Sequence, residues 1–398
     1  MIAVSPGMRN ALAVHGAARV LVYLKEPVQE PPRAFTGRRA LLAAGNGAGG
    51  HSPRPYFYRR LGVVLGTATR ETISALRHDE RVRAIGWAPP IRPIRPVGAA
   101  RTVSPEPGAT WGIEALQVPA LWKQGLTGKG VRVGHLDTGV DARHPALKGA
   151  VVAFTEFDEL GRERRSAAPH DSDMHGTHTA ATIAGRAVAG AAVGVAPGAG
   201  LCSALVIEGG DVVARVLGGM DWAVGQGIRV LSMSLGFPGW WADFLPLTRI
   251  LRARGVLPVF AIGNEGPGTS RSPGNYPEAL SVGAIRQRPR SVAAFSSSER
   301  FRRAKDPAVP DLVAPGVNTI SASPGRAWAA LSGTSMATPH IAGLAALLFE
   351  AHPRATVDSV EKAIFAACAR IAGERPDRQG RGVPSAIRAL EAVRQLGG

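Results

Sequence analysis

Three short segments of the sequence each contain a side chain of a type used in hydrolytic catalysis. In chain order they supply Asp137 within HLDTG, His175 within HGTH and Ser335 within GTSMATP. A serine hydroxyl becomes a strong nucleophile when a base removes its proton, and a carboxylate orients that base and stabilises the imidazolium that forms. The three residues therefore predict an acyl-transfer site in which Ser335 attacks, His175 carries the proton and Asp137 orients His175.

The segments around these residues are of a kind that would hold them in place. The β-branched, partly alternating run 131–136 predicts a strand with Asp137 at its carboxyl end, where open parallel α/β sheets bind ligands. Ser335 precedes apolar residues that recur at i, i+3, i+4 and i+7 between 341 and 348, and Pro339 suits a first helical turn. We therefore expect Ser335 at the amino end of a buried helix, whose dipole favours developing negative charge.

A fourth candidate is Asn264, in the segment GNEG after the apolar run 257–260. An asparagine amide at the end of a strand can donate a hydrogen bond to the oxyanion of a tetrahedral intermediate. The sequence therefore predicts that Asn264 contributes to an oxyanion hole.

Taken together, these motifs resemble those of the subtilisin-like serine proteases (subtilases). The order Asp…His…Ser differs from His…Asp…Ser in trypsin-like enzymes and Ser…Asp/Glu…His in α/β-hydrolases. The resemblance covers most of residues 110–350 and implies a triad of Asp137, His175 and Ser335, with Asn264 in the oxyanion hole. The motifs that carry it are DTG (137–139), HGTH (175–178), SLG (234–236), GNEG (263–266) and GTSMATPH (333–340).

The resemblance also implies how a substrate is bound and cleaved. Ser234, Leu235 and Gly236 would offer backbone groups to a polypeptide substrate, which joins them as an added strand. The implied activity is that of a serine endopeptidase that works through an acyl-enzyme and needs no cofactor for catalysis. Two alternatives stay open: a non-catalytic homologue that only binds peptides, and a processing protease dedicated to one partner.

Metal binding is the competing interpretation of the histidine motif. His175 and His178 are three residues apart and lie close to Asp171 and Asp173, a pattern that could ligate a metal. Such a site would leave Ser335 without a role, so we expect no metal here and a structural role for His178.

The high-affinity calcium site of many subtilases is expected to be absent. That site takes an aspartate from the pattern HPDL and an asparagine from the loop before GVAP. Here the first segment is HPAL (144–147), and the loop 186–193 has no side-chain oxygen, whereas calcium requires six to eight oxygen ligands. Calcium binding elsewhere stays open.

Composition predicts two domains. Residues 1–108 carry 16 basic and 6 acidic side chains and end in a proline-rich stretch, 89–107. We expect a small propeptide-like α+β domain with its linker over 1–108, with strands 20–24, 61–66 and 82–87, a helix 71–81 and a loop 26–55. Over 109–398 we expect a doubly wound α/β domain with a mostly parallel sheet, built on strands 131–136, 201–207, 229–235, 257–262 and 279–285.

The resemblance implies that this first domain assists folding and inhibits the enzyme until the linker is cut, as in a zymogen. Its carboxyl tail would lie in the substrate cleft, which places the cut between Pro89 and Thr110. A permanent domain that only packs against the rest is the alternative.

The formal charge of +17 does not by itself predict a nucleic-acid partner. Only 6 of the 47 basic residues are lysine, and no zinc-finger, arginine-rich or aromatic RNA-binding motif accompanies them. No apolar run approaches the length of a membrane span, so we expect no membrane partner, and we expect no nucleic-acid partner either. The expected oligomeric state is a monomer. The first 23 residues lack a signal-peptide pattern, which predicts a cytoplasmic location for the sequence as written. Secretion is the alternative that the family suggests.

Overall fold

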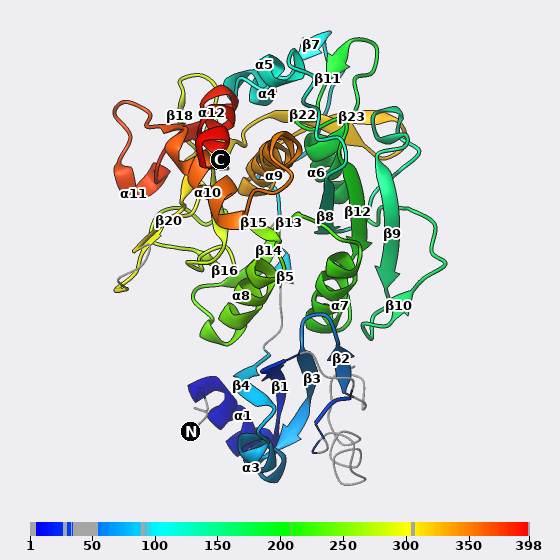
Figure 1. Ribbon diagram of the computed structural model, residues 1–398, viewed down its shortest axis with the longest axis vertical. Coiled ribbons are helices and arrows are strands. Elements are labelled where there is room, and N and C mark those ends of the chain that lie inside the picture. The colour runs from blue at the N-terminus through cyan, green and yellow to red at the C-terminus, as the bar shows by residue number, and fades with distance from the viewer. Residues whose placement is uncertain are drawn as a thin grey trace.

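The computed structural model in Figure 1 describes residues 5–26, 30–32, 34, 55–88, 92–93, 95–207, 209–303 and 307–396. A small four-stranded sheet with two helices lies at one end of the molecule, and a large sheet covered by helices forms the rest. Most of the loop expected over 26–55 lies outside the described residues.

The large sheet has the strand order β10-β9-β12-β8-β13-β15-β17-β18, with β21 also paired to β17. All pairings from β9 to β17, and that of β21, are parallel, and the short edge strands β10 and β18 are antiparallel. The expected doubly wound, mostly parallel sheet is therefore confirmed. Its strands are β8 (Arg132–Asp137), β9 (Val151–Phe157), β10 (Glu163–Arg164), β12 (Gly200–Leu205), β13 (Val230–Met233), β15 (Leu257–Ala261), β17 (Leu280–Arg286), β18 (Ser291–Val292) and β21 (Leu312–Pro315).

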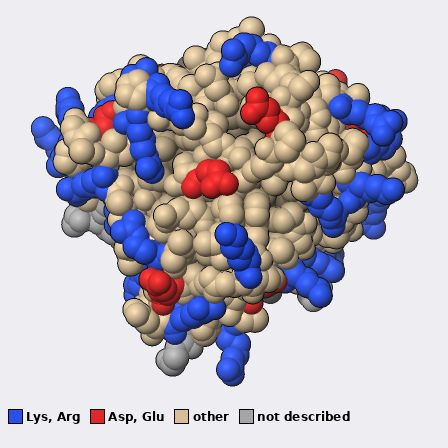
Figure 2. All heavy atoms as spheres, turned by 90° about the horizontal axis from the view of Figure 1, so that it is seen from above, with Lys and Arg blue, Asp and Glu red and all other residues tan. Residues whose placement is uncertain are grey.

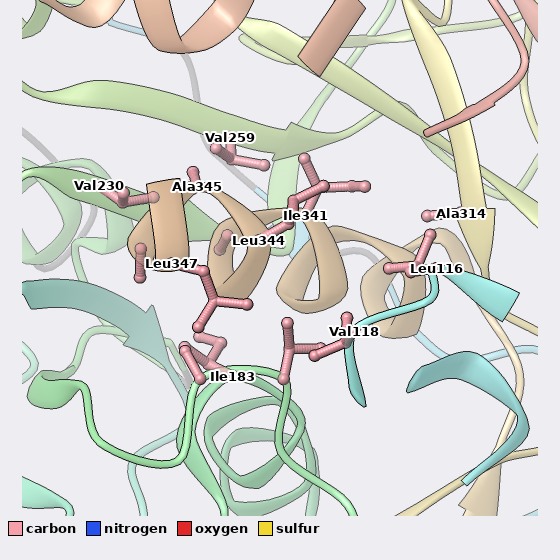
Figure 3. Packing of buried hydrophobic residues seen from close by; sticks show 14 of the residues in the cluster. Leu116, Val118, Ile183, Val230, Val259, Ala314, Ile341, Leu344, Ala345 and Leu347 are labelled. Atoms are coloured by element: carbon pink, nitrogen blue, oxygen red, sulfur yellow. The ribbon is translucent and has the colours of Figure 1, made fainter. Parts of the chain in front are cut away.

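Helices cover both faces of this sheet because alternate strand residues point to opposite sides. Val259 packs with α6 (His175–Ala184) and α9 (Thr334–Ala351), whereas its neighbour Phe260 packs with α7 (Val212–Gly225) and α8 (Leu245–Ala253). Figure 3 shows α9 inserted between the sheet and α6, with Ile341, Leu344 and Ala345 among the strand side chains. The helices α10 (Val357–Ala366) and α12 (Ala386–Leu396) pack outside α9.

Pro339 differs from its expected place. Helix α9 begins at Thr334, so Pro339 lies inside the helix, beyond the first turn. A proline has no backbone N–H to donate, so the carbonyl of Ser335, four residues earlier, loses its helical partner. That carbonyl instead accepts a hydrogen bond from the Ser234 hydroxyl, at 3.2 Å.

The small sheet is antiparallel and has the order β2-β3-β1-β4. Val20 and Val22 on β1 face α1 and α3, whereas Leu21 and Tyr23 face the apolar cluster that contains α7 and α8. The sheet is therefore covered on one side by its own helices and on the other by the large domain. Its elements are α1 (Pro6–His15), β1 (Ala17–Leu24), β2 (Tyr56–Tyr58), β3 (Val63–Thr69), α3 (Arg70–His78) and β4 (Val82–Trp87).

Short elements complete the fold, and the first three of them lie in the linker between the two sheets. They are β5 (Arg92–Pro93), β6 (Arg101–Thr102), β7 (Gly108–Ala109), α4 (Trp111–Ala115), α5 (Pro119–Trp122), η2 (Pro145–Leu147), β11 (Ala191–Ala192), β14 (Leu235–Pro238), η3 (Ala242–Phe244), β16 (Arg271–Ser272), β19 (Glu299–Arg300), β20 (Ala308–Val309), β22 (Thr319–Ser323), β23 (Ala327–Leu331), β24 (Cys368–Ala369), α11 (Pro376–Gln379) and β25 (Val383–Pro384).

Basic side chains do not gather into one patch on the face shown in Figure 2. They are spread mainly around its periphery, with uncharged and acidic side chains between them. Within the described part of the chain, no helix is both long enough and apolar enough to cross a membrane.

Candidate active site

Asp137 and His175 meet where β8 ends and α6 begins. Asp137 is the last residue of the central strand β8, and His175 is the first residue of α6. His175 Nδ1 lies 2.6 Å from Asp137 Oδ1, which also accepts the backbone N–H of Thr138 at 2.8 Å. The carboxylate therefore orients the imidazole, and both side chains are buried.

The charges of the pair stabilise each other. Burial by itself would lower the pKa of His175, but the charge of Asp137 and the hydrogen bond to it hold that pKa above its ordinary value. Burial would raise the pKa of Asp137, but His175 and the N–H of Thr138 hold it below its ordinary value. The other imidazole nitrogen, Nε2, is buried and has no hydrogen-bond partner among the described residues. This arrangement leaves Nε2 to exchange a proton.

Ser335 lies in the first turn of α9 and is fully buried. Asn264, in the loop after β15, is tied to the same turn. Its Oδ1 accepts hydrogen bonds from the backbone N–H and the hydroxyl of Thr334, both at 2.9 Å. These two bonds place the carbonyl oxygen of the Asn264 side chain toward α9 and leave its Nδ2 to donate away from the helix.

Asn264 Nδ2 donates to the backbone carbonyl of Arg95, in the linker between the two sheets, at 2.8 Å. The linker residues on either side of Arg95 also contact the large domain. Upstream, β5 pairs antiparallel with β14. In the backbone register, Pro93 is the partner of Leu235 and Arg92 is the partner of Gly236. Downstream, the N–H of Val97 donates to the carbonyl of Ser332 at 2.7 Å, and β6 pairs with β23.

The linker therefore crosses the candidate site as an added strand. Leu235 and Gly236 supply the edge that it joins, and the Ser234 hydroxyl donates to the carbonyl of Ser335, as described above. A peptide chain in this position presents one carbonyl, that of Arg95, to the Asn264 amide.

Two of the four residues considered as metal ligands, His178 and Asp171, have other partners. His178 Nε2 lies 2.9 Å from the carbonyl of Thr319, and burial lowers the pKa of His178 to about 3. Asp171 accepts the hydroxyl of Thr138 and both the N–H and the hydroxyl of Thr177. Over the described ranges, no group of three or more His, Cys, Asp or Glu side chains could hold a metal ion.

Asp171 has a structural role that the sequence analysis did not assign. Its bonds tie the loop after β8, through Thr138, to the first turn of α6, through Thr177. These are the two segments that carry Asp137 and His175. The signal available in the sequence was a pair of carboxylates, Asp171 and Asp173, shortly before a helix that starts with a catalytic candidate. A carboxylate there can accept the unpaired N–H groups of the first helical turn.

Comparison with known proteins agrees with the geometry. The chain matches the subtilase family, peptidase S8, over residues 128–383. It is 40% identical over 245 residues to M-protease of Shouchella clausii, covering 61% of this chain and 60% of that protein. It is also 40% identical to Subtilisin Savinase of Lederbergia lenta, covering 85% of that protein. The major intracellular serine protease of Bacillus subtilis is 36% identical over 247 residues, 60% of this chain and 74% of that protein. The chain therefore belongs to the subtilase family.

Proposed function

We propose that this protein is a serine endopeptidase that cleaves polypeptides through Asp137, His175 and Ser335. The observation that carries the proposal is the buried hydrogen bond between Asp137 and His175, which leaves the opposite imidazole nitrogen without a partner among the described residues. The Asn264 amide, which already donates to the carbonyl of a bound peptide segment, supports it.

The proposed mechanism combines these contacts with the triad that the family motifs imply. His175 Nε2 removes the proton of Ser335 as the serine oxygen attacks a peptide carbonyl. Asn264 Nδ2 stabilises the oxyanion, a contribution worth about 100- to 1000-fold in turnover for the corresponding asparagine of subtilisin. His175 then protonates the leaving amine, and water hydrolyses the acyl-enzyme by the same proton transfers in reverse.

The test compares the full-length chain with its Ser335→Ala variant. Each is incubated and followed by intact mass, by hydrolysis of a fluorogenic peptide mixture and by reaction with a fluorophosphonate probe. We expect peptide hydrolysis and probe labelling in the wild type only. A wild type in which intact mass shows that the linker is cut, and which still shows neither hydrolysis nor labelling, would overturn the proposal in favour of a peptide-binding homologue.

We also propose that the N-terminal domain, residues 1–108, is an intramolecular inhibitor of this protease. Contacts between the small sheet and α7 support the proposal. The Tyr58 hydroxyl donates to the carbonyl of Ala214 at 3.0 Å, and Arg19 pairs with Asp211, the residue that caps α7. Asp221, on the same helix, accepts the backbone N–H groups of residues 60 and 61. These contacts hold the small domain so that its linker reaches the cleft.

A proline follows the linker residue whose carbonyl contacts Asn264. We propose that Arg95–Pro96 is the bond presented for cleavage, because Asn264 Nδ2 donates to the carbonyl of Arg95. The nitrogen of Pro96 carries a ring carbon in place of a hydrogen, and its φ is confined near −65°. The ring hinders the rotation by which a leaving nitrogen turns its lone pair toward His175. We propose that Pro96 slows self-cleavage and so prolongs inhibition.

Replacing Pro96 with alanine tests this proposal. We expect Pro96→Ala to shorten the lifetime of the full-length chain at least about 10-fold, equivalent to about 1.4 kcal/mol of activation free energy. The new amino terminus would be residue 96. Pro107→Ala, an exposed proline of the same linker, is the control and should behave as wild type. Equal rates and cut sites in all three chains would show that Pro96 has no such role.

We further propose that the protein lacks the high-affinity calcium site of its family. Arg186 supports this proposal, since it lies in the loop that supplies calcium ligands in the family. Its guanidinium donates to the carbonyls of Lys148 and Gly149, and its N–H donates to the carbonyl of Ala146. A fixed side-chain cation thus binds the carbonyls that border HPAL.

A further inference from the structure

A second histidine lies directly behind the catalytic pair. His135 is fully buried on β8, two residues before Asp137. Its Nδ1 lies 2.9 Å from the hydroxyl of Ser203, and its Nε2 lies 2.8 Å from the hydroxyl of Thr179. The Thr179 hydroxyl in turn lies 3.2 Å from Asp137 Oδ2. His135 is thus connected to the catalytic carboxylate through one threonine.

The connection follows from the repeats of a strand and a helix. Residues 135 and 137 are two apart on β8, so their side chains point to the same face. His175 and Thr179 are four apart on α6, so they lie on the same side of the helix, one turn from each other. The helix therefore places His175 against Asp137 and Thr179 beside both Asp137 and His135. Ser203 completes the group because it is the direct partner of His135 on β12.

The two oxygens of Asp137 have different partners. Oδ1 accepts hydrogen bonds from His175 Nδ1 and from the N–H of Thr138, whereas Oδ2 accepts one from the Thr179 hydroxyl. His135 Nε2 is 3.8 Å from Oδ2, too far for a direct hydrogen bond. Thr179 is therefore the group through which His135 can act on the carboxylate.

The carboxylate determines the direction of the hydrogen bonds. Burial lowers the pKa of His135 to about 4, so its ring is neutral at pH 7 and carries one N–H. With the proton on Nε2, His135 donates to Thr179, which donates to Asp137 Oδ2, and Ser203 donates to Nδ1. With the proton on Nδ1, Thr179 would donate to Nε2 and Oδ2 would lose this donor. A hydrogen bond to a charged acceptor is stronger than one to a neutral acceptor, which favours the first arrangement.

We propose that His135 and Thr179 are positioning residues, which hold the Asp137 carboxylate with Oδ1 toward His175 by directing a hydrogen bond to Oδ2. The Thr179 hydroxyl also lies 3.1 Å from the carbonyls of His175 and Gly176. Because His135 donates to the oxygen of this hydroxyl, the proton of Thr179 remains available to the carboxylate. The proposal rests on the proposed peptidase activity for its kinetic consequence. Its structural content, the orientation of Asp137, is independent of that activity.

The test removes the Thr179 hydroxyl and then restores it. We expect Thr179→Val to lower kcat by about 10- to 100-fold with little change in KM, because a hydrogen bond to a charged group is lost. The acidic limb of the kcat–pH profile should also move, since the charge distribution next to His175 changes. Thr179→Ser keeps a hydroxyl and should stay within about 3-fold of wild type. His135→Leu should cause a smaller loss than Thr179→Val, because the Thr179 hydroxyl keeps its proton but, without the Nε2 donor, can turn toward the carbonyls of His175 and Gly176.

Thr182→Val is the matched control. Thr182 lies on the same helix, is equally buried and donates to the carbonyl of His178 without contacting Asp137. If Thr179→Val and Thr182→Val have the same kcat and the same acidic limb, the proposal is overturned.

A second readout does not require activity. In the proton NMR spectrum of the full-length Ser335→Ala chain, a resonance far downfield reports the His175 Nδ1 proton in its hydrogen bond to Asp137. We expect its resonance to shift in Thr179→Val and to stay in place in Thr182→Val, and an unchanged resonance in both would overturn the inference. A wild type without peptidase activity would remove the proposed function but would leave this measurement to decide the role of Thr179.

Discussion

Burial and neighbouring carboxylates shift the pKa of His175, the proposed general base, in opposite directions. Burial disfavours the imidazolium, whereas Asp137, and more weakly Asp171 and Asp173, favour it. The net effect is a pKa above the ordinary 6.5. Because His175 must be neutral to accept the Ser335 proton, this shift has a measurable consequence for activity.

We expect kcat/KM to fall as the pH is lowered through a value above 6.5. In Asp137→Asn the carboxylate charge is gone, so the pKa of His175 drops and the acidic limb moves to lower pH. The same substitution should reduce kcat by about 10⁴-fold, the effect of the equivalent change in another Asp-His-Ser triad. The measurement is kcat/KM against pH for both chains. An acidic limb that is the same in both would contradict the assignment of Asp137.

Residue types and order were enough to predict the catalytic candidates, but not their surroundings. A catalytic role requires particular chemical groups, so Asp137, His175, Ser335 and Asn264 stand out in the sequence. His135 did not, because a histidine in an apolar run is usually a buried residue with local partners. The register of β8 against β12 and α6 was needed to show which partners it has.

Among the elements, strands were easier to predict than the helix α1. The β-branched runs of the large sheet predicted five of its strands, each to within two residues at both ends. These strands are β8, β12, β13, β15 and β17. Helix α1 has a capping serine, Ser5, a proline at its first position and Gly16 in a left-handed conformation at its end. The apolar residues of α1 are followed almost immediately by those of β1. The sequence therefore showed no clear boundary between the helix and the strand.

The loop before β12 offers a test of the proposal that the calcium site of the family is absent. We expect Arg186→Ala to lower Tm by about 2–6 °C, since hydrogen bonds from a charged group to the carbonyls of Lys148 and Gly149 are lost. Added calcium should not restore the wild-type Tm, because the loop supplies no carboxylate. Arg165→Ala removes an exposed ion pair and serves as the control. Recovery of the Tm of Arg186→Ala in calcium would instead indicate a latent calcium site.

On the scale of the whole molecule, the two sheets share one apolar cluster. Leu21, Tyr23 and Leu65 of the small sheet pack with Leu217 and Leu251 of α7 and α8. The sequence predicted both α+β and α/β regions but not how one docks on the other, because strands in both regions are apolar on both faces and no face is marked as the contact surface. The contact depends on residues more than 100 positions apart, whose pairing no local pattern encodes.

The linker that crosses the site is covalently part of the enzyme it occupies. Until its backbone is broken, the effective concentration of this segment at the cleft is set by chain length and does not change when the protein is diluted. One cut turns a unimolecular equilibrium into a bimolecular one, and the occupancy of the cleft then depends on protein concentration. After the same cleavage, a smaller fraction of the protease would thus be released where the concentration of the protein is high than where it is low.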